Sequence, residues 1–381
     1  MTPAQKLGND RRRLAGIAAG GAAGSLLAIA LVACATANEP APPPEPEAQV
    51  IPDAGPDAER PTDAAPEAEP LPVTCGVGNL CSVTTPMAFG AITSVTGRSS
   101  ADVWASATGG MLMRWNGQTW SAVDTKMYDT LSRLFVTPGE IWGVAGDLLW
   151  RRIEETGESA SFRINILADS AFRPMSGVTA LSNGDAYVSL LPSRNQAAAL
   201  QPLAKVADFA TKKLVFPKDP VYPATNRTQP ASVEALFLVP DKALWLVGAR
   251  GAVIRYPISQ GGLGDGAFVP VDSQEDLLAA WGHGEQLWAV GTSGTILHFD
   301  GSSWRTPSSG TTVTLNAIFG FDANDIWAAG EGGTILHFDG TSWSPVSVAG
   351  YDGKLTSIWG AASTDVWIGG EDAMFHWGAL Q

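Results

Sequence analysis

Histidine is the most versatile residue type for chemistry in this sequence of 381 residues, and three of the four histidines occupy the same position in a repeat. His298, His337 and His376 each stand near the end of a short apolar segment, in separate copies of a repeat. Such histidines could bind a metal ion or act as a general base. Because each belongs to a different copy, we expect them to lie too far apart to share a metal ion. We expect each to cover a neighbouring repeat while its polar tip stays in water.

Aspartates recur in the same way and raise the question of catalysis by paired carboxylates. Asp102, Asp325 and Asp365 precede the second segment of their copies. A glycosidase needs two carboxylates about 5 to 10 Å apart, and no pair stands out in the sequence. We expect these aspartates to set turns by bonding nearby backbone amides. We therefore assign no catalytic residue, no metal ligand and no cofactor.

Two cysteines, Cys75 and Cys81, stand at the start of the repeat region. Their spacing does not suit a zinc site, which usually takes four ligands, and no histidine lies nearby in the sequence. In an exported chain such a pair is typical of a disulfide. We predict a Cys75–Cys81 disulfide.

The positions of these residues follow from seven copies of one repeat. The clearest copies are LNAIFGFDANDIWAAGEGGTILHFDGTSWSPV (315–346) and LLAAWGHGEQLWAVGTSGTILHFDGSSWRTP (277–307), and weaker ones begin near Leu131, Gly177 and Val233. One aromatic residue marks the second segment of each copy: Trp104, Trp142, Tyr187, Trp245, Trp288, Trp327 and Trp367. A period near 40 residues indicates a solenoid, a propeller or an array.

Turn residues decide the fold class. Pairs such as Asn116-Gly117, Gly332-Gly333 and Asp339-Gly340 separate four short apolar segments in each copy, as tight hairpins require. Four-stranded units of this kind pack as blades around an axis, so we predict an all-β fold, a β-propeller with seven blades. Six or eight blades stay alternatives, because the copies between 177 and 232 are degenerate.

The ends of the repeat region predict how the ring closes. The last copy stops at Gln381, after its third strand. Residues 80–86 (LCSVTTP) precede the first copy and can supply the missing fourth strand. This would leave no blade edge unpaired.

The strings GTILHFDGSSW and GTILHFDGTSW resemble the repeats of bacterial propellers related to the sialidase-type BNR repeat and to the photosystem II stability and assembly factor family. The resemblance covers most of 88–381 and implies a fold more than an activity. The turn after Asp339 is one residue shorter than the BNR Asp-box. A sialidase would also need an arginine triad and a tyrosine nucleophile, which we cannot place here.

The N-terminus has the features of an export signal. Three arginines (11–13) precede an uncharged run of about 19 residues, 14–32, which matches the charged and apolar regions of such a segment. The following Leu31-Val32-Ala33-Cys34 resembles the lipobox of bacterial lipoproteins, which implies a lipidated Cys34 as membrane anchor. The inner-membrane retention signal of that family is usually an aspartate directly after the cysteine, so Ala35 favours the outer membrane. A plain signal anchor with an incidental cysteine is the alternative.

Composition divides the chain into a signal peptide (1–33), a lipidated cysteine with a tether (34–72) and a propeller (73–381). Residues 39–72 hold 11 prolines and nine acids against one arginine, so we expect a disordered spacer. The formal net charge of the chain is −14, which argues against a nucleic-acid partner.

In a rigid propeller the binding residues usually lie on the loops that connect the strands. We therefore expect the binding face where the second-to-third-strand turns meet the crossings between blades. Its polar and aromatic members would be Tyr128, Arg250, Glu331, Tyr351 and Glu371. The function we predict is that of a membrane-anchored envelope lipoprotein that binds a protein or polysaccharide without catalysis. A glycan-active enzyme, hydrolase or lyase, and an assembly factor for envelope proteins are the alternatives.

Overall fold

The computed structural model describes residues 74–75, 80–87, 90–164, 174–191, 202–217, 232–259 and 262–378, with only the backbone described for residues 74 and 75. The predicted signal peptide, Cys34 and the tether lie outside the described residues. No helix within the described ranges is long and apolar enough to cross a membrane.

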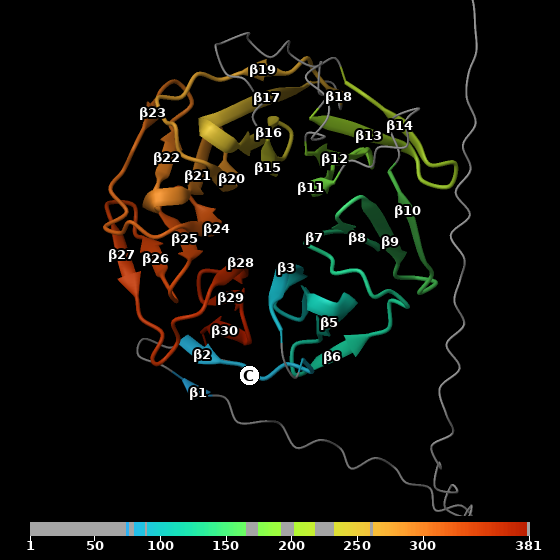
Figure 1. Ribbon diagram of the computed structural model, residues 1–381, viewed down its shortest axis with the longest axis horizontal. Coiled ribbons are helices and arrows are strands. Elements are labelled where there is room, and N and C mark those ends of the chain that lie inside the picture. Colours follow the sequence, from blue (N-terminus) through green and yellow to red (C-terminus); the bar gives the residue numbers. More distant parts are fainter. Residues whose placement is uncertain are drawn as a thin grey trace, which may run out of the picture. The chain divides into compact units, whose positions relative to one another are not determined.

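Seven antiparallel sheets stand around a common centre and form the blades of a β-propeller, as predicted (Figure 1). Blade 1 contains β3 (Ile92–Ser99), β4 (Asp102–Ala107), β5 (Met111–Trp115) and β6 (Trp120–Val123). Blade 2 contains β7 (Arg133–Thr137), β8 (Glu140–Ala145), β9 (Leu148–Ile153) and β10 (Ser159–Arg163). Blade 3 contains β11 (Met175–Ala180), β12 (Ala186–Leu190), β13 (Leu203–Asp208) and β14 (Lys213–Val215).

The second half of the ring follows the same order with one irregular blade. In blade 4, β15 (Val233–Val239), β16 (Ala243–Gly248) and β17 (Ala252–Ser259) are followed by two short strands that both pair with β17, namely β18 (Gly262–Leu263) and β19 (Ala267–Phe268). Blade 5 contains β20 (Leu277–His283), β21 (Gln286–Gly291), β22 (Ile296–Phe299) and β23 (Trp304–Arg305). Blade 6 contains β24 (Leu315–Asp322), β25 (Asp325–Gly330), β26 (Ile335–Phe338) and β27 (Trp343–Val346).

Blade 7 joins the two ends of the propeller sequence. Its strands β28 (Leu355–Ala362), β29 (Asp365–Gly370) and β30 (Ala373–Trp377) are completed by β2 (Leu80–Ser82), which pairs with β30. The predicted fourth strand is therefore confirmed, in a shorter form, and the N–H of Val83 donates to the Met374 carbonyl at 2.8 Å. A fifth strand, β1 (Thr74–Cys75), pairs with β2 and places Cys75 opposite Cys81.

This register suits the predicted disulfide. Cys81 is disulfide-bonded, and it is also 5% exposed. The side chain of Cys75 lies outside the described part of the chain, so its pairing with Cys81 stays a prediction.

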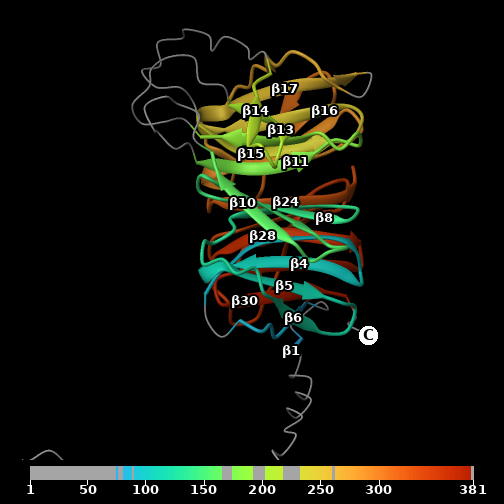
Figure 2. The ribbon, with the colours of Figure 1, turned by 90° about the vertical axis from the view of Figure 1, so that its right-hand side faces the viewer.

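The second strand of each blade is the most buried, because each sheet is covered by a neighbouring blade on both faces. In β25, every residue after Asp325 is buried. The strands run from one face of the ring to the other, as Figure 2 shows from the side for β4, β8 and β16. The second strand of a blade therefore requires apolar residues on both of its faces, without the alternation of apolar and polar residues that a half-exposed strand shows.

Aromatic side chains fill the spaces between blades. Trp367 of blade 7 packs against Trp115 and Trp120 of blade 1, with ring centroids 5.1 and 5.2 Å away. The same arrangement joins other neighbouring blades: Trp327 with Trp377, Trp288 with Phe338, and Trp245 with Phe299. The tryptophans of the repeat therefore hold neighbouring blades together.

Candidate functional site

The second-to-third-strand turns and the blade crossings meet on one face of the ring, which we call the turn face. In four blades the last glycine of the turn lies against the next crossing. A Cβ atom at these glycines would stand 2.1 to 2.4 Å from a carbonyl oxygen of the crossing, too close for any side chain: Gly110 with Met127, Gly251 with Ser273, Gly294 with Thr311, and Gly333 with Tyr351. Glycine at these positions thus fixes the architecture of the turn face.

The residue before each of these glycines is a second feature that the four turns share. It has a left-handed backbone, with φ of 57° at Arg250 and 55° at Ser293. At Gly109 and Gly332 a Cβ would meet no atom within 4 Å. The turns therefore require glycine at the last position, whereas the preceding position also takes arginine or serine.

Three of the five predicted face residues come together in blades 6 and 7, around Lys354. The Lys354 ammonium lies 3.0 Å from a carboxylate oxygen of Glu331. Its backbone N–H donates to the Glu371 carboxylate at 3.4 Å. Tyr351, in the same crossing, donates its hydroxyl toward the carbonyls of Lys354 and Glu371, at 3.1 and 2.9 Å.

Tyr351 thus braces the turn face from within. Desolvation, followed by the nearby charge of Glu371, raises the pKa of its phenol to about 12. Its hydroxyl is used by backbone carbonyls, so it is poorly placed to anchor a ligand. Glu371, in contrast, is exposed.

The other two predicted residues lie elsewhere on the ring. Arg250 belongs to the turn of blade 4, where its backbone N–H donates to Asp276 at 2.8 Å. Tyr128 lies on the crossing from blade 1 to blade 2 and is 92% exposed. The structure therefore places the five residues on one face but does not gather them into one cluster.

The crossing that carries Tyr128 is held in a fixed conformation. Thr125 donates its hydroxyl to the Gly110 carbonyl at 3.2 Å and accepts the Met127 N–H at 3.2 Å. The Lys126 N–H donates to the Asp124 carboxylate at 2.9 Å. An exposed tyrosine on a braced loop is a preorganised contact point, which reduces the entropy lost on binding.

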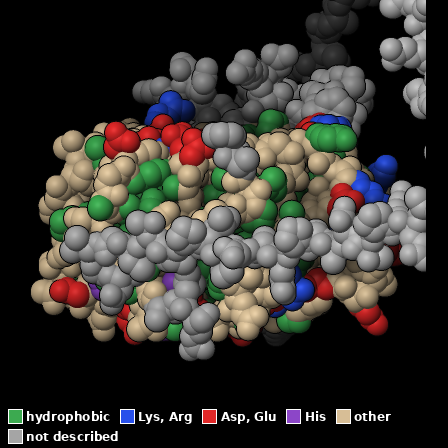
Figure 3. Space-filling view, turned by 90° about the horizontal axis from the view of Figure 1, so that it is seen from below, with side chains coloured by type: hydrophobic (Ala, Val, Ile, Leu, Met, Phe, Trp, Pro, Cys, Tyr) green, Lys and Arg blue, Asp and Glu red, His purple; other side chains and the backbone are tan. Residues whose placement is uncertain are grey.

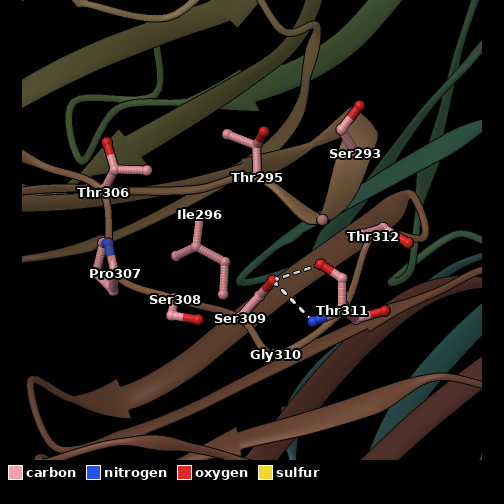
Figure 4. A pocket seen from close by; sticks show the side chains of 11 residues that line it. Ser293, Thr295, Ile296, Thr306, Pro307, Ser308, Ser309, Gly310, Thr311 and Thr312 are labelled. Carbon is pink, nitrogen blue, oxygen red and sulfur yellow. Dashed lines mark hydrogen bonds between the residues drawn. The ribbon is translucent and has the colours of Figure 1, made fainter.

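A shallow groove opens on the turn face between the turn of blade 5 and the crossing to blade 6, with a volume of about 650 Å³. Figure 4 shows that its walls carry mainly hydroxyl side chains. Ser309 donates to the Thr311 carbonyl and accepts the Thr311 N–H, which curves the crossing around the groove. The hydroxyl-bearing lining residues are Ser293, Thr295, Thr306, Ser308, Ser309, Thr311 and Thr312.

The recurrent aspartates and histidines form a structural triad that repeats within blades. In blade 6, Asp325 accepts hydrogen bonds from Trp327 Nε1 at 3.2 Å and from His337 Nε2 at 2.8 Å. In blade 1, Asp102 accepts from Trp104 Nε1 and Arg114 Nε, each at 3.0 Å. The expectation that these aspartates bond backbone amides was wrong. Residues i and i+2 of a strand share a face, so the carboxylate reaches the tryptophan and its cross-strand neighbour instead.

The histidines, likewise, cover tryptophans of their own blades and not of neighbouring ones. His298 stacks on Trp288 with a centroid distance of 3.8 Å and an interplanar angle of 7°. His376 is only 2% exposed and bonds Asp365 at 2.8 Å, so its tip is not in water as expected. Each histidine is occupied within its own blade. Among the described residues there is no group of three or more histidines, cysteines or acids that could hold a metal ion.

Aspartates do set turns, but at the third-to-fourth-strand hairpins. Asp300 accepts the N–H groups of Ser302 and Ser303, and Asp339 does the same for Thr341 and Ser342. These bonds lower the pKa of both carboxyls.

On the side of the ring seen in Figure 3, basic side chains lie singly or in small groups beside acidic ones.

Comparison with known proteins gives similarity in structure alone. No protein-family model matches the sequence, and no curated protein matches it significantly. The structure is similar to YCF48 from Cyanidioschyzon merolae, with a TM-score of 0.61, 13% identity, and coverage of 79% of this chain and 98% of that one. YCF48 bound to a D1 peptide gives a TM-score of 0.60 and 15% identity, and the match covers 81% of this chain and 100% of that one. The RRP9 WD40 repeats give a TM-score of 0.58 and 8% identity, and the match covers 80% of this chain and 99% of that one. At these identities the likeness shows the β-propeller fold.

Proposed function

We propose that this chain is a membrane-anchored binding protein of the cell envelope whose turn face holds a protein partner without catalysis. The observation that carries the proposal is Tyr128, 92% exposed on a braced crossing. Tyrosine is enriched at protein interfaces and among the residues that dominate their binding energy. An exposed tyrosine on a hydrogen-bonded loop is the contact that a partner would use.

The distribution of features on the turn face supports a macromolecular partner over a small ligand. Tyr128 lies between blades 1 and 2, the hydroxyl-lined groove lies between blades 5 and 6, and the Lys354 cluster lies in blades 6 and 7. One ligand that touches all three must span much of the ring. A YCF48 structure with a bound D1 peptide is a precedent for peptide binding on this fold.

A crosslinking experiment tests the partner class and its place on the ring. A photoreactive phenylalanine analogue replaces Tyr128 in the full chain, and in a matched chain it replaces Val215, an apolar residue of β14 that is 45% exposed. We expect one protein to be crosslinked in cells from position 128 and not from position 215. Equal crosslinking at both positions, or capture of saccharide alone, would contradict the proposal.

The anchor is a separate part of the proposal and rests on the lipobox-like Leu31-Val32-Ala33-Cys34. Several acyl chains would give durable attachment where one chain gives marginal binding. A Cys34→Ala variant should leave the membrane fraction, while a Cys81→Ala variant should stay in it. If Cys34→Ala still sediments with membranes, the lipoprotein assignment is wrong.

A further inference from the structure

The charge of Glu234 acts on Arg133, although the two residues belong to different blades. Arg133 opens β7, the inner strand of blade 2, and Glu234 is the second residue of β15, the inner strand of blade 4. Blade 3 stands between these blades (Figure 1). Burial lowers the pKa of the Arg133 guanidinium, and the charge of Glu234 counteracts this effect. Both residues therefore belong to strands that stand around the centre of the ring.

The position of Arg133 along its strand places it near the turn face. The crossing that carries Tyr128 leads directly into β7, so Arg133 follows Tyr128 by one short segment. Its side chain is partly exposed although burial affects its pKa. Both properties are expected of a side chain that protein surrounds and solvent still reaches.

Arg133 has little to bind within the described part of the molecule. Its Nη1 donates to the Ser132 carbonyl at 3.0 Å. None of the ion pairs found among the described residues includes it, whereas Arg98, Arg114 and Arg151 each pair with a carboxylate. A partly buried guanidinium that bonds one carbonyl among the described residues keeps N–H donors for an added anion.

The repeat shows that the fold does not need an arginine here. In the six other blades this position of the inner strand carries a small residue: Ser94, Gly177, Ala235, Ala279, Ala317 and Ser357. Two of them join neighbouring blades, since Ser94 accepts the Leu134 N–H at 3.1 Å and Ser357 accepts the Val95 N–H at 2.8 Å. In blade 2, Arg133 places a long cationic side chain at this position instead of a small residue.

We propose that Arg133 is an anion site at the turn-face end of the ring centre, and that it binds a carboxylate group of the partner. The guanidinium fork matches a carboxylate with two parallel hydrogen bonds. The negative charge of Glu234 opposes a doubly charged phosphate more than a singly charged carboxylate. The carboxylate comes from an acidic side chain or from a free C-terminus. The inference rests on the proposed function, but it is tested with small probes that need no partner.

Arginine labelling of the full chain measures the site directly. Phenylglyoxal modifies accessible guanidinium groups, and peptide mapping compares Arg133 with Arg152, for which no ion pair is found among the described residues and which bonds Ser159. We expect acetate to slow the labelling of Arg133 and not of Arg152, and acetamide to slow neither. Equal protection of both arginines, or no protection by acetate, would overturn the site.

Peptide probes in the same assay identify the source of the carboxylate. Acetyl-pentaglycine with a free C-terminus is compared with an amidated pentapeptide that carries one internal aspartate, and amidated acetyl-pentaglycine is the control. Protection by the first identifies a C-terminus, and protection by the second identifies an acidic side chain. Protection by the uncharged control to the same degree would contradict anion recognition.

Variants keep the inference testable without labelling. Arg133→Gln should lose the rise in unfolding temperature that acetate produces over chloride at equal ionic strength, and Arg133→Lys should keep less than about a tenth of the acetate affinity because it lacks the fork. Glu234→Gln should bind acetate roughly threefold to tenfold more tightly and should also accept phosphate. If acetate stabilises Arg133→Gln as much as the unchanged chain, Arg133 is not the site. A partner that binds through Tyr128 while Arg133 binds no anion would leave the proposed function intact and refute this inference alone.

Discussion

Cys81 lies directly opposite His376 in the ladder that joins β2 to β30, although the two residues come from opposite ends of the propeller sequence. The ring is thus closed by a strand that precedes the first blade. Leu80, beside Cys81, is 2% exposed and packs in the core that blades 6 and 7 share. The stability of the whole ring should therefore depend on three residues near the N-terminal edge of the domain.

Leu80→Ala tests this dependence. Removing a buried leucine side chain from a well-packed core costs about 2 to 5 kcal/mol. Ser82→Ala, on the same strand but exposed, should change the free energy of unfolding by less than about 0.5 kcal/mol. Urea unfolding followed by tryptophan fluorescence measures both variants. Similar small effects of the two changes would show that β2 does not contribute to closure.

The triad of acid, tryptophan and base predicts a second difference in stability. Asp325→Ala removes the acceptor of both Trp327 Nε1 and His337 Nε2, and we expect a loss of about 1 to 3 kcal/mol. Asp325→Asn keeps one oxygen in place and should lose less than half as much. Both are measured by urea unfolding at neutral pH. Equal losses in the two variants would mean that the carboxylate charge, and not the shared acceptor, stabilises the blade.

The fold was predictable from the sequence because each blade repeats the same local signals. Trp327 and its equivalents mark second strands, and glycine pairs such as Gly332-Gly333 mark turns, so the blade count and the closing strand followed from spacing. Blade 4 departs from the pattern, since β17 carries two short outer strands that no repeat residue announces. Repetition specifies the common blade and not its local exceptions.

The site was less predictable, because the roles of its residues depend on three-dimensional partners. Tyr351 and Tyr128 are both crossing tyrosines in the sequence, yet one is bonded to carbonyls and the other is exposed. Arg133 was missed. A comparison of Leu131-Ser132-Arg133 with Leu355-Thr356-Ser357 would have revealed a large cation at a small-residue position, but not the opposing Glu234.

The Asp300 hairpin predicts a dependence of stability on acid. Backbone and hydroxyl donors of Ser303 and Ser302 lower the pKa of Asp300 in the folded state. Its stabilising contribution is therefore complete above the unfolded pKa of about 4 and is lost as the pH falls through the lower folded value. The difference in unfolding free energy between the unchanged chain and Asp300→Asn should therefore shrink as the pH falls from about 6 to about 2.

Blade 1 offers the reciprocal change for this hairpin. Asn116 accepts the Gln118 and Thr119 N–H groups at 2.9 and 2.8 Å, in the same geometry, but carries no charge. Asn116→Asp should gain stability at neutral pH and lose the gain in acid, which urea unfolding at a series of pH values detects. A gain that is constant with pH would contradict charge-assisted bonding at these turns.

Tyr351 predicts the opposite behaviour in alkali. Its pKa is raised to about 12 in the folded state, while an unfolded tyrosine ionises near pH 10. Below pH 10 the phenol is neutral in both states, so Tyr351→Phe should cost only the lost hydrogen bonds, about 1 kcal/mol. Above about pH 10 the unfolded state releases a proton that the folded state keeps, so the unchanged chain loses stability as the pH rises. The variant should lose less over the same range, because Tyr187, whose pKa is also raised to about 12, still contributes its own share.

Difference spectra of tyrosinate absorbance between the two chains locate the folded titration of Tyr351. Ionisation of the folded residue near pH 10 would contradict the burial of the Tyr351 phenol beside the charge of Glu371.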